Sequence, residues 1–237
     1  MEKTEFSQEL KQKANKINIE INDKQVKEFY DYMNLLIEWN EKINLTAITE
    51  PKDIILKHFI DSITISKEIK DKQKVADIGT GAGFPGIPLN IINGNAEYTL
   101  VDSLNKRINF LNEVIEKLGL KNIVTNHSRV EDFAKNNRAK YDVATSRAVA
   151  PLNVLLEYLL PLVKIGGICI CMKGSNVNEE IQESKRALEL LGGKIEKIEE
   201  ICLPESDNTR NIIIIKKVKI TPLKYPRKAG IPKKEPL

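Results

Sequence analysis

One segment constrains the fold of this chain more than any other: a short apolar strand candidate, Lys74–Ile78, runs directly into a glycine-rich turn. The turn reads GTGAGFPG from Gly79 to Gly86 and holds four glycines. Glycine permits a tight turn and lets a ligand lie against bare backbone. Ligands of open parallel sheets bind beyond the carboxyl ends of the strands, which is where this turn falls. The segment therefore predicts an α/β sheet with a ligand site at its first turn.

The rest of the chain supports a sheet of this kind, because strand and helix patterns alternate from residue 74 onward. The strand candidates are Lys74–Ile78, Tyr98–Asp102, Ile123–Asn126, Tyr141–Ser146, Gly167–Met172, Lys194–Leu203 and Asn211–Val218. One predicted helix ends at Gly119 and another covers Val177–Leu191. Such alternation implies right-handed crossovers and a mostly parallel sheet with helices on both faces. The last two strands lack a helix between them and must pair antiparallel, so the sheet edge is expected to carry a reversed strand.

Three regions are predicted along the chain. Residues 1–70 form a helical extension, since Asp23–Trp39 has the apolar spacing of an amphipathic helix and Pro51 opens a second helix that reaches about Ser66. Residues 71–219 form a Rossmann-like domain with a seven-stranded sheet. Residues 220–237 form a basic tail rich in proline, which is expected to be irregular or only partly ordered.

Composition limits the function classes. The 237 residues carry a formal net charge of +4, whereas residues 216–237 alone carry +7, from eight basic side chains and one acidic one. A weakly acidic body with a basic tail points to a polyanion as a partner. The apolar runs are too short for a bilayer crossing, the first residues lack the apolar core of a secretion signal, and the three cysteines show no zinc or disulfide spacing. We therefore expect a cytoplasmic protein with no membrane partner and no metal site.

Two acidic residues at strand ends bear on the identity of the ligand. Gly81, Gly83 and Gly86 fit the GxGxxG dinucleotide pattern, and Asp102 lies 21 residues after Gly81, as that pattern requires. However, Asp77 lies at the end of the first strand, where its carboxylate would repel a diphosphate seated on the following helix N-terminus. S-adenosylmethionine carries no phosphate and presents a sulfonium and an ammonium, which favour a nearby carboxylate. The methyl donor is the better fit, with Asp102 expected to accept hydrogen bonds from both ribose hydroxyls.

Beyond these spacings, the motifs of the chain resemble one family. The glycine turn from Asp77 to Pro88 and the segment Val101-Asp102-Ser103 are similar to those of the RsmG (GidB) family. Further matching motifs are Asn44-Leu45-Thr46, His58-x-x-Asp61-Ser62, Ser128-Arg129-Val130-Glu131, Ser146-Arg147-Ala148, Met172-Lys173-Gly174 and Pro222-x-x-Tyr225-Pro226-Arg227. The resemblance extends over essentially the whole chain. It implies a class I S-adenosylmethionine-dependent methyltransferase that acts in bacteria on N7 of one guanine of 16S ribosomal RNA, with the small ribosomal subunit as its partner.

The same resemblance implies cofactor contacts. Gly79 and Phe84 would contact the cofactor from the glycine turn, Val130 and Glu131 would hold the adenine, and Arg147 would lie beside the cofactor. Together with the residues that the spacing selects, the candidate cofactor-binding residues are Asp77, Gly79, Gly81, Phe84, Asp102, Val130, Glu131 and Arg147. Guanine N7 has a lone pair and no proton, so its methylation needs no general base and no catalytic residue is assigned.

Some of these residues have alternative roles. Arg147 ends an apolar strand and needs an anionic partner, which is the cofactor carboxylate, an RNA phosphate or an internal salt bridge such as one to Asp77. His58 and Asp61 share a helix face and either line the site or join the extension to the main domain. Trp39 is expected to pack against the second helix of the extension.

Two other functions stay open. A methyltransferase of the same fold that acts on a small molecule or a protein would keep its activity without the basic tail, whereas an RNA enzyme would lose much of it. A nicotinamide-dependent oxidoreductase would bind NAD in place of S-adenosylhomocysteine. Nothing in the sequence demands more than a monomer.

Overall fold

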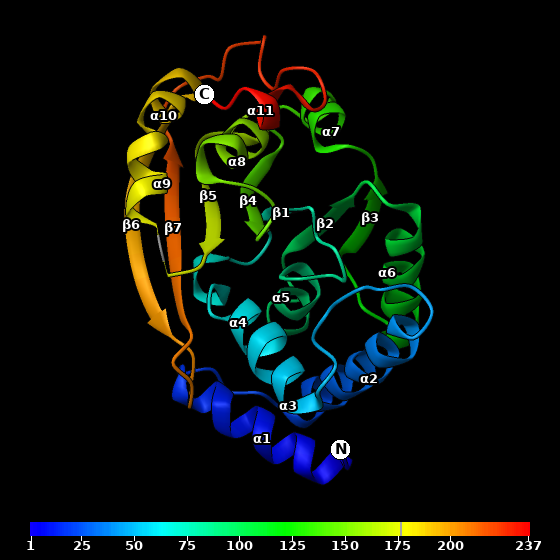
Figure 1. The fold of residues 1–237 in the computed structure, drawn as a ribbon. Helices are drawn as coiled ribbons and strands as arrows, with labels where there is room; N and C mark the ends of the chain where they lie inside the picture. Colours follow the sequence, from blue (N-terminus) through cyan, green and yellow to red (C-terminus); the bar gives the residue numbers. More distant parts are fainter. Residues whose placement is uncertain (176) are drawn as a thin grey trace.

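Residues 1–175 and 177–237, which the computed structural model describes, are built around a seven-stranded sheet (Figure 1). The strands are β1 (Lys74–Ile78), β2 (Glu97–Asp102), β3 (Ile123–His127), β4 (Tyr141–Arg147), β5 (Val163–Lys173), β6 (Gly193–Cys202) and β7 (Thr209–Lys217). Their order across the sheet is β3-β2-β1-β4-β5-β7-β6, and β1 to β5 run parallel. The expected Rossmann-like α/β class is confirmed.

The helices fall between the strands and at both ends of the chain. They are α1 (Lys3–Lys16), α2 (Asp23–Asn40), α3 (Pro51–Ile54), α4 (Asp61–Ile63), α5 (Gly86–Ile92), α6 (Asn105–Leu118), α7 (Val130–Asn136), α8 (Leu152–Leu159), α9 (Asn178–Glu183), α10 (Lys185–Leu191) and α11 (Ile231–Lys234), with a π-helical turn η1 (Ile55–Ile60) and a 3-10 turn η2 (Ser66–Glu68). The predicted helix over Asp23–Trp39 is confirmed as α2, which begins at a capping box formed by Asn22 and Gln25.

Two other predicted helix boundaries can be compared with the structure. The helix before Gly119 is confirmed as α6, and Gly119 has the left-handed φ of 64° that favours glycine at this position. The predicted helix over Val177–Leu191 is divided into α9 and α10 at Ser184. Ser184 has ψ −4°, and its hydroxyl donates to the Glu180 carbonyl, so a local hydrogen bond competes with helix continuation.

The predicted antiparallel pairing at one edge of the sheet is also confirmed. β7 pairs antiparallel with both β5 and β6, so the reversed strand lies second from the edge and β6 is outermost. Alternate residues of β7 face opposite sides of the sheet. Ile212 and Ile214 pack into the core shared with α1, α2, α5 and α6, whereas Ile213 and Ile215 pack into the core shared with α8 and α10. The continuous apolar run in β7 therefore follows from burial on both faces.

The helical extension packs on the same face of the sheet as α5 and α6. Tyr32 of α2 is fully buried, and its hydroxyl donates to the Ala82 carbonyl within the glycine turn. Trp39, expected to pack against the second helix, instead contacts α6: its indole N–H donates to Glu113 at 3.1 Å and its ring centre lies 5.6 Å from that of Phe110. The extension thus supports the turn that the sequence marks as the ligand site.

The tail, residues 220–237, is mostly irregular as expected, but it is packed against α7 and α8, where Figure 1 shows it in red. Arg227 donates to both carboxylate oxygens of Glu157, a fully buried residue of α8. Arg138 donates to three carbonyls of the tail, and Tyr225 is buried. The tail is therefore irregular, which is one of the two expectations, and it is also tied to the domain because the buried Glu157 carboxylate takes its counter-ion from the tail.

Candidate functional site

A cavity of about 600 Å³ opens at the carboxyl ends of the parallel strands. Its walls come from the glycine turn after β1, the ends of β2 and β4, the start of α7, the loop of the extension at residues 45–46, and the tail. Cavities of this size are typical of sites for small molecules and cofactors. Every predicted cofactor residue except Asp77 lines it.

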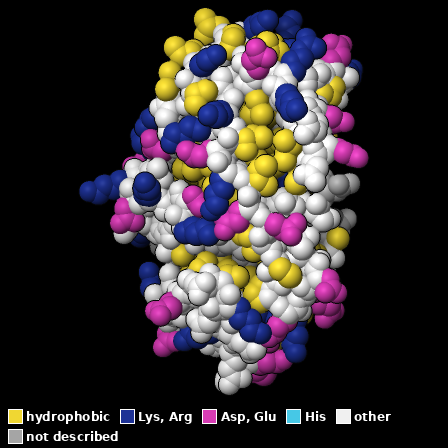
Figure 2. All heavy atoms as spheres, turned by 90° about the vertical axis from the view of Figure 1, so that its left-hand side faces the viewer, with side chains coloured by type: hydrophobic (Ala, Val, Ile, Leu, Met, Phe, Trp, Pro, Cys, Tyr) yellow, Lys and Arg dark blue, Asp and Glu magenta, His cyan; other side chains and the backbone are white. Residues whose placement is uncertain are grey.

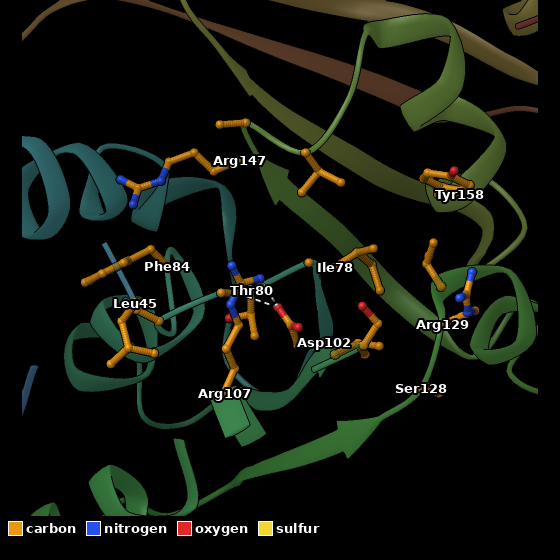
Figure 3. A pocket seen from close by; sticks show the side chains of 18 of the residues that line it. Leu45, Ile78, Thr80, Phe84, Asp102, Arg107, Ser128, Arg129, Arg147 and Tyr158 are labelled. Carbon is orange, nitrogen blue, oxygen red and sulfur yellow. Dashed lines mark hydrogen bonds and ion pairs between the residues drawn. The ribbon is translucent and has the colours of Figure 1, made fainter. Parts of the chain in front are cut away.

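Figure 3 shows that the cavity has two ends with the carboxylate of Asp102 between them. One end carries Leu45, Phe84 and Arg147; the other carries Ser128, Arg129 and Tyr158. The first end belongs to the glycine turn and the extension, and the second to the loop after β3 and to α8. A ligand that fills the cavity would therefore contact both ends and pass the carboxylate of Asp102 between them.

Asp77 lies beneath the floor of the cavity. It is completely buried, and its Oδ2 accepts hydrogen bonds from Thr80 Oγ1 at 2.7 Å and from the Gly86 amide at 2.9 Å. The Gly86 amide is the first of α5, so a carboxylate already occupies the place where a dinucleotide diphosphate would seat. Asp77 is not among the described residues that line the cavity, because its Oδ2 is turned toward the first amide of α5; its contact with the cofactor stays a prediction.

The charge of Asp77 nevertheless bears on the ligand. Burial raises the pKa of Asp77 to about 6, although the hydrogen bonds from Thr80 and Gly86 act in the opposite direction. Its Oδ1 is buried and has no hydrogen-bond partner within the described part of the chain. Residues 78–82, which follow Asp77 directly in the chain, line the cavity. Gly79 among them has φ 67°, and an added Cβ would lie 2.6 Å from Val149 Cγ2. A positive charge on a ligand would stabilise this unpartnered carboxylate oxygen, whereas a negative charge would destabilise it.

The carboxylate of Asp102 lies between the two ends of the cavity and accepts three hydrogen bonds. Its Oδ1 accepts from the Leu104 amide at 2.9 Å, and its Oδ2 accepts from the Gly81 amide at 3.0 Å and from Arg107 Nη1 at 3.2 Å. A carboxylate accepts about four hydrogen bonds. These three contacts leave room for one ribose hydroxyl, and a second would have to displace the long contact with Arg107. The residue fits a nucleoside ligand, with less spare capacity than the sequence suggests.

The end of the cavity expected to hold adenine is closed by the tail. Glu131 is 6% exposed, and its Oε1 accepts from the Gly230 amide at 3.0 Å. Gly230 and Lys233 of the tail line the cavity beside Val130 and Glu131. Part of the Glu131 carboxylate thus fixes the tail, and the apolar side chain of Val130 is free to contact a planar base. Sequence reasoning misses this role of the tail, because no local pattern shows that residue 230 folds back onto residue 131.

At the other end of the cavity, Arg147 joins β4 to the extension. Its Nη1 donates to the Lys57 carbonyl and to Asp61 Oδ2, both at 3.0 Å. Arg210 of β7 donates to the other oxygen of Asp61 at 3.2 Å. The internal salt bridge considered for Arg147 is therefore present, with Asp61 as its partner in place of Asp77. The Arg147 guanidinium also lies 5.0 Å from the centre of the Phe84 ring, which keeps it at the cavity wall.

His58 completes this end of the site. Its ring stacks on Phe84 with centres 4.3 Å apart, its Nδ1 lies 3.1 Å from Arg147 Nη2, and its Nε2 lies 2.9 Å from Thr46 Oγ1. Burial, and then the charge of Arg147, lower the pKa of His58 to about 3, so the ring is neutral. His58 both lines the cavity and joins the extension to the main domain, so the two roles considered for it coincide.

The cavity is more basic than acidic. Among the residues described, its lining holds the basic side chains of Arg107, Arg129, Arg147 and Lys233 and the acidic side chains of Asp102 and Glu131. Positive charge around an opening attracts polyanions, which is the class of partner that the basic tail also predicts.

This chain is similar to one known family over most of its length. The family model described as "GidB: rRNA small subunit methyltransferase G" matches residues 25–212. The chain belongs to the GidB family. The chain is 54% identical to "Ribosomal RNA small subunit methyltransferase G" of Desulforamulus reducens, with 96% of this chain and 97% of that protein aligned. It is 55% identical to the protein of the same name from Acetivibrio thermocellus, with 94% and 93% aligned.

Solved structures agree with the fold of this GidB-family protein. A SAM-dependent methyltransferase from Aquifex aeolicus has a TM-score of 0.53 at 20% identity, covering 76% of this chain and 97% of that one. M. jannaschii TYW2 in complex with AdoMet has a TM-score of 0.53 at 16% identity, covering 67% and 77%. These structures share the fold of this chain, which is the class I methyltransferase fold. Among the described residues, no helix has the length and apolar character needed to cross a membrane.

Proposed function

We propose that this protein transfers the methyl group of S-adenosylmethionine to N7 of one guanine in 16S ribosomal RNA. The observation that carries the proposal is the near full-length similarity to relatives named Ribosomal RNA small subunit methyltransferase G. The site agrees with it, since a carboxylate occupies the first amide of α5, an acid ends β2, and basic side chains surround the opening.

The chain's own residues have defined tasks in this reaction. Bound S-adenosylmethionine supplies an electrophilic methyl group on its sulfonium. Asp102 orients the ribose, Val130 and Glu131 bound the adenine, and the backbone at Gly79 lies against the ligand. Phe84 and Arg147 would lie beside the cofactor at the other end of the cavity, and we propose that the target base enters at this end. Because N7 carries no proton, these residues contribute by alignment and by excluding water, not by removing a proton.

Partners and location follow from the same proposal. The substrate is 16S ribosomal RNA in the small ribosomal subunit, the protein acts in the cytoplasm, and the basic tail and opening contact phosphates. We also propose that the protein is a monomer. The exposed edge strand β6 carries the ion pair Lys197–Glu199 at 2.7 Å, and Lys67 pairs with the same glutamate at 3.0 Å. Figure 2 shows basic and acidic side chains interspersed on this side of the molecule, a pattern that hinders edge-to-edge pairing.

The proposal is tested by incubating the protein with radiolabelled S-adenosylmethionine and small ribosomal subunits that lack the modification. We expect label at N7 of a single guanine of 16S RNA. The matched control is Asp102→Ala, which should lose both transfer and binding of S-adenosylhomocysteine in calorimetry. Label in a small molecule or a protein, with none in RNA, would favour the alternative methyltransferase. Binding of NAD without binding of S-adenosylhomocysteine would favour the oxidoreductase.

A further inference from the structure

The loop at residues 45–46 lies at the end of the cavity that carries Phe84 and Arg147, where we propose that the target base enters. The side-chain hydroxyl of Thr46 in this loop has an unusual set of hydrogen bonds. Thr46 lines the cavity together with Leu45, His58 and Phe84. The loop is fixed from behind, because Asn40 Oδ1 accepts from the amides of Leu45 at 2.7 Å and of Thr46 at 2.9 Å. The Thr46 side chain is therefore held in position before any substrate binds.

The protonation of His58 follows from its partners. A guanidinium can only donate hydrogen bonds, so His58 Nδ1, which lies 3.1 Å from Arg147 Nη2, must accept. A neutral histidine that accepts at Nδ1 carries its proton on Nε2. The Nε2–H then donates to Thr46 Oγ1, which lies 2.9 Å away. Arg147 thus dictates, through His58, that Thr46 receives a hydrogen bond.

Thr46 Oγ1 also accepts a second hydrogen bond, from the Ile48 amide at 3.0 Å. A hydroxyl has two lone pairs and one hydrogen, so both acceptor positions of Thr46 are filled. No acceptor for its hydrogen is present among the described residues. The hydroxyl of this cavity-lining residue can therefore make one further hydrogen bond, in which it is the donor.

We propose that Thr46 selects guanine over adenine by donating a hydrogen bond from its hydroxyl to O6 of the target base. The inference rests on the proposed function. On the major-groove edge, guanine presents O6 as an acceptor beside N7, whereas adenine presents an amino group as a donor. An ordinary hydroxyl could accept from that amino group, but Thr46 has no free lone pair to do so. A contact at O6 leaves N7 free to face the methyl donor.

The test measures transfer at N7 to small subunits reconstituted with 16S RNA that carries either guanine or 2-aminopurine at the target position. 2-aminopurine keeps N7 and lacks O6. For the unsubstituted protein we expect kcat/KM to be about tenfold or more higher with guanine. Thr46→Val, which keeps the shape of the side chain, should reduce this preference to within about twofold. Thr46→Ser, which keeps the hydroxyl, should retain the preference.

Binding of S-adenosylhomocysteine is measured for all three proteins, and equal affinity shows that the variants keep the cofactor site. Equal use of the two bases by the unsubstituted protein overturns the inference, and this comparison requires no variant. An undiminished preference in Thr46→Val overturns it as well. Transfer to guanine N7 with either of these results leaves the proposed function intact, whereas absence of transfer to any guanine defeats the proposed function itself.

Discussion

The buried carboxylate of Asp77 gives the sharpest quantitative prediction. Replacing Asp77 with Asn removes the charge and keeps the shape of the side chain. The pKa of Asp77 rises from its ordinary value of 3.8 to about 6. At about 1.4 kcal/mol for each pKa unit, ionised Asp77 destabilises the ligand-free protein by about 3 kcal/mol relative to a carboxyl with an ordinary pKa.

The sign of the pH dependence follows from linkage. Because the folded protein holds this proton more tightly than the unfolded chain does, the contribution of Asp77 is most favourable below pH 4. It falls as pH rises and reaches its full penalty above about pH 6. We expect Asp77→Asn to be about 1–3 kcal/mol more stable than the unsubstituted protein at pH 8, since an unpartnered amide nitrogen offsets part of the gain. At pH 4.5 the difference should be much smaller.

Binding of the ligand should offset the destabilisation caused by ionised Asp77. If a sulfonium and an ammonium compensate the buried charge, affinity for S-adenosylmethionine should weaken about tenfold between pH 7.5 and pH 5, as Asp77 takes up a proton. Asp77→Asn should bind more weakly at pH 7.5 and show little dependence on pH over this range. Urea unfolding at several pH values measures stability, and calorimetry measures affinity.

Asp142 supplies a matched control for the same substitution. Although it is partly buried, hydrogen bonds from the Lys74 amide and from Lys164 lower the pKa of Asp142. Asp142→Asn should therefore lose stability at pH 8, in contrast to Asp77→Asn. If Asp77→Asn shows no pH-dependent difference in stability and binds S-adenosylmethionine as well as the unsubstituted protein does, the assignment of a cation site above Asp77 is wrong.

Three further predictions concern the tail and the glycine turn. Arg227→Ala should cost about 3 kcal/mol in denaturant unfolding, because the fully buried Glu157 carboxylate keeps the amide of residue 227 but loses its counter-ion. The double variant with Glu157→Gln should recover much of the loss. Truncation after Lys219 should abolish binding of S-adenosylhomocysteine in calorimetry, since the tail closes one end of the cavity; unchanged affinity would contradict the role given to the tail. Gly86→Ala should lose about 1–3 kcal/mol of stability in thermal unfolding, because the added Cβ would lie 2.2 Å from a leucine methyl of β2. Gly174→Ala, whose added Cβ meets no atom within 4 Å, is its control.

The truncation also bears on how the substrate class can be decided. Sequence reasoning treats loss of activity without the tail as evidence for an RNA substrate. In the structure the tail lines the cavity that we propose to hold the cofactor, so its removal should impair transfer to any substrate. Comparison of substrates with the intact chain is therefore the appropriate test.

Local signals were sufficient for the elements that depend on neighbouring residues. The apolar spacing of Asp23–Trp39, the glycine cap of α6 and the strand before the glycine turn are set by interactions within a few residues, and the structure agrees with each. Family motifs and strand ends also indicated that Asp102 and Arg147 lie at the cavity. They could not indicate that Arg147 pairs with Asp61, because those residues lie 86 positions apart.

Hydrophobic periodicity and the backbone requirements of glycine act residue by residue, so local patterns were enough to predict a parallel sheet, a glycine turn and acids at two strand ends. The partner of each charged group depends on the folded chain. The tertiary structure turned Asp77 toward α5, brought residue 230 onto Glu131, and filled both lone pairs of Thr46. Burial makes every unpaired polar group costly, so distant segments supply the partners, and those pairings depend on the folded shape and not on local sequence.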